Sequence, residues 1–336
     1  MKIIWLKGPY HEALRKKGMT EPKRQKKISI IVPCYNEAPV IRLFIDALDQ
    51  VIHEQADYFF EVILIDDGSN DLTVEVVSDC MKEFPFIRLL QLTRNFGKEV
   101  ALSAGLDHAM GDAVIFMDAD LQHPPGILSA FISAWEEGAD MVVGRRVSRS
   151  TDSKLYRLLA RSFYNIHNGL SEVKLPANVG DFRLIDRSVA DQLKELRERQ
   201  RFMKGLFSWV GYDPIYVDYE VAPRTEGTSK YNKWRSWNFA LEGITSFSTI
   251  PLRIWTYLGL ILLLLGAAYS MIIIVKAFLY GVDVPGYITL LTALISFGGV
   301  QLIGLGVLGE YVGRIYIEVK QRPLYLTKKS TRQEQE

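Results

Sequence analysis

The sequence has few cysteines and almost no net charge. Its 336 residues include only Cys34 and Cys80 as cysteines, and the formal net charge is +1. Two cysteines do not make a disulfide framework, so we expect both to be reduced packing residues in a cytoplasmic domain. The first 27 residues are basic but have no apolar core and no cleavage site, so we expect no signal peptide. Internal repeats and low-complexity segments are also missing, and we expect no nucleic-acid partner.

Charge is absent from two long stretches near the end of the chain. Residues 254–275 contain no charged side chain, and neither do residues 284–309. At about 1.5 Å per residue, each run can cross a hydrocarbon layer of about 30 Å. A buried helix of a soluble protein rarely has an uncharged apolar run of this length. We therefore predict transmembrane helices at about 254–276 and 284–309, joined as a hairpin. Basic residues beyond the hairpin place residues 1–253 in the cytoplasm.

Ahead of the hairpin, strand-like and helix-like segments alternate. Predicted strands cover 28–32, 59–65, 87–92, 113–117 and 141–143, and predicted helices cover 38–54, 72–84, 98–110 and 125–137. This alternation is typical of a doubly wound α/β fold with a mostly parallel sheet. The predicted organisation is a basic tail at 1–27, an α/β domain at 28–225, a juxtamembrane segment at 226–253, the membrane hairpin at 254–318 and a cytoplasmic tail at 319–336.

Polar residues follow each of the first four predicted strands. They form the stretches 33–37, 66–71, 93–98 and 118–125. Because the carboxyl ends of parallel strands meet at one edge of a sheet, we predict a ligand crevice there. Asp118 and Asp120 are oxygen donors of the kind that hold Mg²⁺ or Mn²⁺ together with substrate phosphates. A solvated turn is the alternative interpretation of this pair taken alone.

These stretches resemble a known family. Pro33-Cys34-Tyr35-Asn36-Glu37, Asp66-Asp67-Gly68-Ser69 and Asp118-Ala119-Asp120 are similar to the motifs of family 2 glycosyltransferases. That resemblance implies a GT-A fold and a nucleotide-diphospho-sugar donor. A closer resemblance, to the polyprenyl-phosphate glycosyltransferases, rests on the hairpin and on the segments Arg94-Asn95-Phe96-Gly97-Lys98-Glu99, Asp118–Pro125, Gly144-Arg145-Arg146, Asp181-Phe182-Arg183 and Gly227-Thr228-Ser229-Lys230-Tyr231. The resemblance covers about residues 28–320.

The resemblance implies a donor side of the site. The expected nucleotide-sugar ligands are Pro33, Tyr35, Glu37, Asp66, Lys98 and Asp118, and the expected metal ligands are Asp118, Asp120 and Gln122. Glu37 could instead be a charge favoured at a helix N-terminus. Lys98 could be a solvated helix start, and Arg94 an anion partner or a structural ion pair. We expect Asp71 to be a cap or turn residue and His123 to shape its loop.

The acceptor side must hold a lipid monophosphate. Its second pKa is near ~6, so at pH 7 the nucleophile is already largely dianionic. We therefore expect Asp181 mainly to orient the acceptor, and only secondarily to act as a base. Arginine suits phosphate, and we favour Arg145, with a structural ion pair as its alternative. Further candidates for the acceptor phosphate are Arg157, Arg161, Arg224 and Lys230. We expect the catalytic group to be Asp181, Asp120 and Arg145.

The predicted enzyme transfers one sugar, with inversion, to undecaprenyl phosphate at the cytoplasmic face of a bacterial inner membrane. UDP-glucose is the favoured donor, and UDP-aminoarabinose and GDP-mannose are alternatives. A processive polysaccharide synthase is a rival, but its tryptophan-containing Gln-x-x-Arg-Trp motif is missing from residues 200–204. A second rival is a membrane-tethered protein that binds nucleotide sugar without turnover. The family resemblance and the Gly-x-x-x-Gly at 309–313 suggest a homotetramer as an additional expectation.

Overall fold

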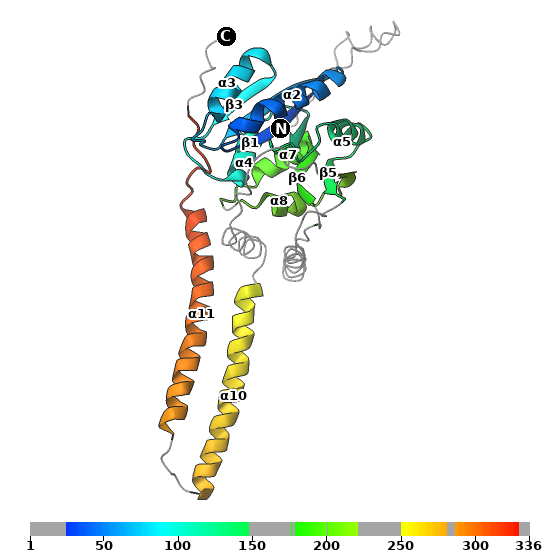
Figure 1. Ribbon diagram of the computed structural model, residues 1–336. Coiled ribbons are helices and arrows are strands. Elements are labelled where there is room, and N and C mark those ends of the chain that lie inside the picture. Colours follow the sequence, from blue (N-terminus) through cyan, green and yellow to red (C-terminus); the bar gives the residue numbers. More distant parts are fainter. Residues whose placement is uncertain are drawn as a thin grey trace, which may run out of the picture.

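The computed structural model describes residues 25–147, 176, 179–199, 201–220, 250–280 and 286–328. In this part of the chain an α/β domain is followed by two long helices (Figure 1). Predictions for the basic tail up to residue 24 and for the juxtamembrane segment up to residue 249 lie outside the described residues. So do those for Arg157, Arg161, Arg224 and Lys230.

A seven-stranded mixed sheet forms the centre of the domain. Its strands are β1 (Lys26–Cys34), β2 (Tyr58–Asp66), β3 (Ile87–Gln91), β4 (Ala113–Phe116), β5 (Met141–Arg146), β6 (Val179–Asp186) and β7 (Ile215–Tyr219), in the order β3-β2-β1-β4-β6-β5-β7. The first four strands pair in parallel, as predicted. Strand β6 runs antiparallel between β4 and β5, and β7 pairs in parallel with β5. The predicted GT-A-like α/β fold is confirmed, and β6 and β7 are additions that the alternating pattern did not predict.

Helices cover both faces of the sheet. They are α2 (Ala38–Glu54), α3 (Thr73–Glu83), α4 (Lys98–His108), α5 (Ile127–Glu136), α7 (Arg187–Glu195) and α8 (Met203–Trp209). Successive strand side chains point to opposite faces, so Ile30 packs in the core under α2, α3 and α5. Its neighbour Ile31 packs in the core under α4, α7 and α8. Burial on both faces explains why the central strands are continuously apolar. Each fully buried large side chain contributes about 1.5–3 kcal/mol to folding.

The two C-terminal helices are α10 (Ile250–Tyr280) and α11 (Tyr287–Val319), which lie beside each other (Figure 1). Within the described residues, one segment, Phe297–Val319 of α11, is long and apolar enough to cross a membrane. Leu302, Ile303 and Leu305 on this segment are exposed, as expected of side chains that contact lipid. Helix α11 extends ten residues beyond the predicted end at 309, because Glu310 and Arg314 form an i,i+4 ion pair that is compatible with a continued helix.

Candidate active site

The carboxyl ends of the parallel strands meet at one edge of the sheet. The amide of Asp67 donates to the carbonyl of Cys34 (2.9 Å), and the amide of Leu92 donates to the carbonyl of Asp66 (2.9 Å). The amide of Met117 donates to the carbonyl of Ile31 (3.1 Å). These bonds continue the sheet pairing beyond the strands. They bring the four predicted polar stretches together, as a crevice at this edge requires.

The position of Asp66 suits a residue that binds a substrate. It is buried, its Oδ1 accepts a hydrogen bond from the amide of Ser69 (3.0 Å), and its Oδ2 has no partner among the described residues. The turn beside it is fixed, because the amide of Asn36 donates to Ser69 Oγ and the amide of Asn70 donates to Asn36 Oδ1, both at 2.9 Å. A buried carboxylate oxygen without a donor is costly. A hydroxyl or N–H of a bound nucleoside would satisfy it.

Asp71 is a structural residue, as predicted. Its carboxylate accepts hydrogen bonds from the amide and hydroxyl of Thr73 (3.1 and 2.5 Å) and from the amide of Ala38 (3.3 Å). It therefore joins the starts of α2 and α3. Glu37 occupies the N-cap position of α2, but its side chain does not cap the helix. This leaves the donor-binding role predicted for Glu37 open.

Asp67 fixes the loop that leads to α4. Its two carboxylate oxygens accept hydrogen bonds from the amides of Phe96 (2.7 Å) and Gly97 (2.9 Å). Gly68 has a φ of +72°, and a Cβ there would lie 2.5 Å from the backbone carbon of Arg94. Only glycine fits this left-handed conformation and close approach. The two loops are thus locked together, and Lys98 begins the helix that follows them.

Lys98 bridges the two halves of the predicted site. Its Nζ lies 2.7 Å from Asp118 Oδ1 and 2.9 Å from Asp181 Oδ2. Asp118 follows β4, whereas Asp181 belongs to β6, and the antiparallel pairing of these strands (Phe116 with Arg183) places the two carboxylates together. The structure therefore brings three predicted site residues into one charged cluster.

Lys98 and the two carboxylates support each other's charge. Burial opposes the charge of Lys98, but Asp118 and Asp181 outweigh it and raise the pKa of Lys98 well above its usual range. Burial likewise raises the pKa of Asp181, but Lys98 and Lys204 outweigh it, and the resulting pKa lies well below the usual value. A general base works best with a pKa near the working pH. The ion pair therefore favours the orienting role predicted for Asp181 over the role of base.

The two arginines that end β5 have different surroundings. Arg145, predicted to bind the acceptor phosphate, forms two hydrogen bonds with the exposed Asp218 (2.6 and 2.9 Å) and is itself 47% exposed. Arg146 donates to the hydroxyl of Tyr219 (3.1 Å). Burial lowers the pKa of Arg146, but Tyr219, Asp118 and Asp120 outweigh this effect and raise it. The charges of Asp118 and Asp120 therefore act on Arg146, whereas Arg145 is paired with Asp218.

The loop after β4 is held by its own contacts. The amide of Gln122 donates to Asp120 Oδ1 (3.1 Å), and Leu121 has a φ of 58°. His123 is buried and stacks on Phe182 with ring centroids 4.6 Å apart. Burial lowers the pKa of His123, so its ring is neutral at pH 7. The packing agrees with the predicted loop-shaping role of His123.

Asp118 and Asp120 are suited to a divalent cation that binds together with the diphosphate of a substrate. Among the described residues, no three or more His, Cys, Asp or Glu side chains are grouped as metal ligands. Asp118 and Asp120 could supply one or two oxygens, which is the usual protein share for Mg²⁺ when phosphates complete its coordination. The donor set therefore suits a divalent cation whose coordination a diphosphate completes.

Two charged residues of this region were not predicted. Glu99 is half-buried beside the cluster, and its Oε2 accepts a hydrogen bond from the amide of Met203 at the start of α8 (2.7 Å). Burial and the nearby Asp181 raise the pKa of Glu99 to about 7. The positive charge of Lys204, the next residue of α8, acts to lower the pKa of both Glu99 and Asp181. Glu99 belongs to the motif at 94–99 on which the family resemblance rests, but that motif gave it no role, and Lys204 lies in α8, distant in sequence from α4.

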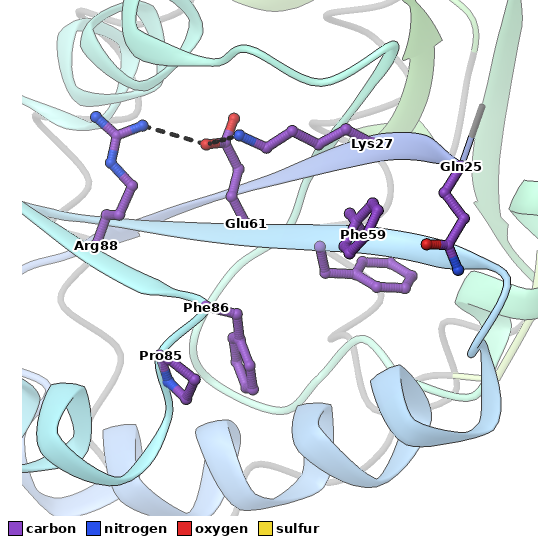
Figure 2. A pocket seen from close by; sticks show the side chains of 8 residues that line it. Gln25, Lys27, Phe59, Glu61, Pro85, Phe86 and Arg88 are labelled. Carbon is purple, nitrogen blue, oxygen red and sulfur yellow. Dashed lines mark hydrogen bonds and ion pairs between the residues drawn. The ribbon is translucent and has the colours of Figure 1, made fainter.

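A hollow of about 550 Å³ lies at the opposite edge of the sheet, near the amino ends of β1, β2 and β3 (Figure 2). Its lining consists of Gln25, Lys27, Phe59, Phe60, Glu61, Pro85, Phe86 and Arg88. Glu61 accepts hydrogen bonds from Lys27 (2.7 Å), Ser29 (2.6 Å), the amide of Met110 (2.8 Å) and Arg88 (3.2 Å). Since its carboxylate is fully engaged, we interpret Glu61 as a structural centre of this edge and place the chemistry at the carboxyl ends.

Comparison with known proteins agrees with this geometry. Residues 29–194 match glycosyl transferase family 2, and residues 250–315 match the GtrB C-terminal hairpin. The chain is 50% identical over 306 residues to the SfII prophage-derived bactoprenol glucosyl transferase of Shigella flexneri, covering 91% of this chain and 99% of that protein. It is 48% identical over 301 residues to an uncharacterised glycosyltransferase of Synechocystis, covering 89% of this chain and 94% of that protein.

Among solved structures, the mannosyltransferase PcManGT of Pyrobaculum calidifontis, in complex with GDP-Man and Mn²⁺, is 22% identical with a TM-score of 0.43. That match covers 69% of this chain and 67% of the other. The assignment rests on the full-length relatives and on the two matched segments. The chain is a glycosyltransferase that belongs to glycosyl transferase family 2 and carries the GtrB C-terminal hairpin behind its catalytic domain.

Proposed function

We propose that this enzyme transfers a single glucosyl residue from a nucleotide-diphospho-sugar, with UDP-glucose favoured, to a polyprenyl phosphate. The observation that carries the proposal is the Lys98 bridge between Asp118 and Asp181, which joins a donor side to an acceptor side. The name of the Shigella relative, a bactoprenol glucosyl transferase, supports both the sugar and the lipid class.

On the donor side, Asp66 would accept hydrogen bonds from the nucleoside, supported by its buried, unpartnered Oδ2. Pro33, Tyr35 and Glu37 would complete that pocket. Lys98 would move its contacts from the carboxylates to the diphosphate. Asp118, Asp120 and Gln122 would hold Mg²⁺ or Mn²⁺, and the cation would offset the charge that develops on the leaving nucleoside diphosphate.

On the acceptor side, an oxygen of the lipid phosphate attacks the anomeric carbon of the sugar. The new carbon–oxygen bond forms as the bond to the diphosphate breaks, so the configuration inverts. The phosphate is largely dianionic at pH 7, so the step requires no proton transfer. Asp181 would orient the acceptor, and Arg146 would bind its phosphate through the guanidinium fork. Further candidates for contact with the acceptor phosphate are Arg145, Arg157, Arg161, Arg224 and Lys230.

The hairpin supports a membrane-bound enzyme, which we place in the bacterial cytoplasmic membrane with two spans and a cytoplasmic catalytic domain. A homotetramer remains a proposal, based on the family resemblance and on Gly309 and Gly313 of α11. Among the described residues no heavy atom lies within 4 Å of a Cβ built at either glycine, so close contact with another helix is sterically open.

The function is tested with the purified full-length protein, undecaprenyl phosphate and labelled nucleotide sugars. We expect label from UDP-glucose to enter the lipid phase in the presence of Mg²⁺ or Mn²⁺. Label from UDP-aminoarabinose or GDP-mannose alone would replace the donor assignment. Transfer of many sugars to one acceptor would favour a processive synthase. Failure with every donor would favour a protein that binds nucleotide sugar without turnover.

The two arginines of β5 provide a matched pair of variants. We expect Arg146→Ala to raise the KM for the lipid phosphate by about 30-fold, because a charge-assisted phosphate contact is worth about 2 kcal/mol. Arg145→Ala is expected to change it by less than about threefold, since exposed ion pairs contribute little. Steady-state kinetics with the lipid as variable substrate measures both. The reverse order of effects would return the phosphate to Arg145.

A further inference from the structure

The chain returns to the catalytic domain after the membrane hairpin. Beyond α11 it turns at Gln321, which has a φ of 49°, and residues 321–328 lie against the α/β domain. We call these residues the C-terminal strap. The amide of Lys328 donates to the carbonyl of Gln91 (2.8 Å), and the amide of Thr93 donates to the carbonyl of Leu326 (2.9 Å). These bonds form an antiparallel bridge around the buried Leu92.

Side chains fix the strap at a second place. The hydroxyl of Tyr325 donates to Asp107 Oδ2 (3.0 Å), and its ring lies 6.3 Å from the ring of His108. Asp107 and His108 are the last two residues of α4. The strap therefore contacts α4 at its C-terminal end and also contacts Thr93, five residues before the helix begins at Lys98.

The end of α11 is tied to the domain as well. The amide of Arg199 donates to Glu318 Oε1 (2.6 Å), and Arg199 Nε donates to the carbonyl of Arg322 (3.0 Å). Arg199 lies between α7 and α8. The contacts around residues 318–328 thus connect the second hairpin helix and the strap to the segment before α8, the helix of Lys204, and to the C-terminal end of α4, the helix that begins at Lys98.

We propose that the C-terminal strap is a positioning element for the donor site. It holds Lys98 and the loop before it in a fixed position relative to the membrane hairpin. The loop at 94–97 is held from one side by Asp67, whose carboxylate accepts hydrogen bonds from the amides of Phe96 and Gly97. The strap holds it from the other side through Thr93. Releasing the strap removes one of the contacts that hold this segment, so the loop opens more often and Lys98 spends less time in place.

The proposal rests on the proposed transfer reaction for its kinetic test, and on amide exchange for a test that needs no turnover. Lys328→Pro removes the N–H that donates to Gln91, because proline has none. Lys328→Ala removes the same side chain and keeps the N–H, so it is the matched control. Tyr325→Phe removes only the hydroxyl that donates to Asp107.

We expect Lys328→Pro in the full-length protein to raise the KM for the nucleotide sugar and the exchange rate of the Phe96 and Gly97 amides, each about tenfold, the effect of one lost net hydrogen bond. Tyr325→Phe is expected to raise both about threefold, and Lys328→Ala to leave both unchanged. The KM for the lipid and amide exchange in α2 should not change in any variant. If Lys328→Pro matches Lys328→Ala in exchange, the strap does not position the loop. If the unmodified enzyme transfers no sugar, the proposed function fails, and the exchange comparison still decides the role of the strap.

Discussion

Replacing Asp120 by asparagine is expected to lower the rate of sugar transfer by about 1000-fold. The reason is that the variant holds less firmly the cation that offsets the charge of the leaving nucleoside diphosphate. Asparagine has nearly the same shape, and its amide oxygen can still accept the hydrogen bond that the amide of Gln122 gives to Asp120 (3.1 Å). The turn after β4 should therefore persist, and the variant should lose the charge without losing the fold. Single-turnover transfer of labelled sugar measures the effect.

Asp112 provides a matched control for this variant. It precedes β4, whereas Asp120 follows it, and its carboxylate accepts a hydrogen bond from the amide of Lys27 (2.8 Å) at the opposite edge of the sheet. Asp112→Asn is expected to leave transfer within about twofold of the unmodified enzyme, since a neutral acceptor preserves the bond at modest cost. Equal losses in the two variants would indicate general destabilisation.

Metal binding gives the same prediction a second readout. Mn²⁺ bound in the presence of nucleoside diphosphate can be counted by electron paramagnetic resonance, without turnover. We expect Asp120→Asn to weaken this binding at least about tenfold, because hard cations depend on carboxylate charge. Unchanged Mn²⁺ binding by the variant would remove Asp120 from the metal site and assign its effect on rate to another step.

The sequence predicted the first half of the sheet well, for a physical reason. Buried parallel strands must be apolar on both faces, and the connecting helices must be amphipathic, so β1 to β4 produce a strong alternating pattern. Strand β6 is different, because its segment includes Asp181 and Arg183 among apolar residues. It also pairs with β4 across about 65 intervening residues. Local patterns do not encode such a distant pairing.

The same limit applies to the site. The convergence of Asp66 and Asp118 follows from parallel topology, which the alternating pattern predicts. The contact between Lys98 and Asp181 depends on where β6 inserts, and the contact between Glu99 and Met203 depends on where α8 packs. Neither is visible in a motif. Lys98 and Asp181 could be predicted as members of a site, but their contact could not.

The choice between Arg145 and Arg146 stays a prediction, for a more local reason. A one-residue change of register moves every following side chain to the other face of a strand. The pairing of β5 with β6 is irregular between Val143 and Arg145. At Gly144 a Cβ would lie 2.7 Å from Phe182, so this close approach requires glycine. Counting alternate residues from the buried part of β5 therefore cannot decide which arginine faces the carboxylates.

Replacing Lys98 by methionine is expected to lower transfer at pH 7 by about 100-fold or more, the effect of removing one preorganised charge from the transition-state site. Methionine retains much of the apolar length of lysine, so packing at the start of α4 is preserved. Without the ammonium group, Asp118 and Asp181 face each other as buried like charges. Lys98→Arg keeps the positive charge and is expected to recover part of the rate.

The pH dependence of the methionine variant shows whether Lys98 also keeps Asp181 ionised. With Lys98 present, the pKa of Asp181 is depressed, so its ion pair stabilises the fold above the unfolded pKa of about 3.9 and is lost only as pH falls through the lower folded pKa. The unmodified enzyme should therefore show no acid limb from Asp181 between about pH 5 and 8.

Removing Lys98 takes away the largest contribution that lowers the pKa of Asp181, so burial, which raises it, is opposed only by Lys204 and Arg183. The acid limb of kcat/KM should then move to higher pH in Lys98→Met, and return toward its original position in Lys98→Arg. A methionine variant that loses activity equally at every pH would show that Lys98 acts only on the diphosphate. A shifted limb would mean that Lys98 also keeps Asp181 ionised, so that one lysine serves the leaving group and the orientation of the nucleophile.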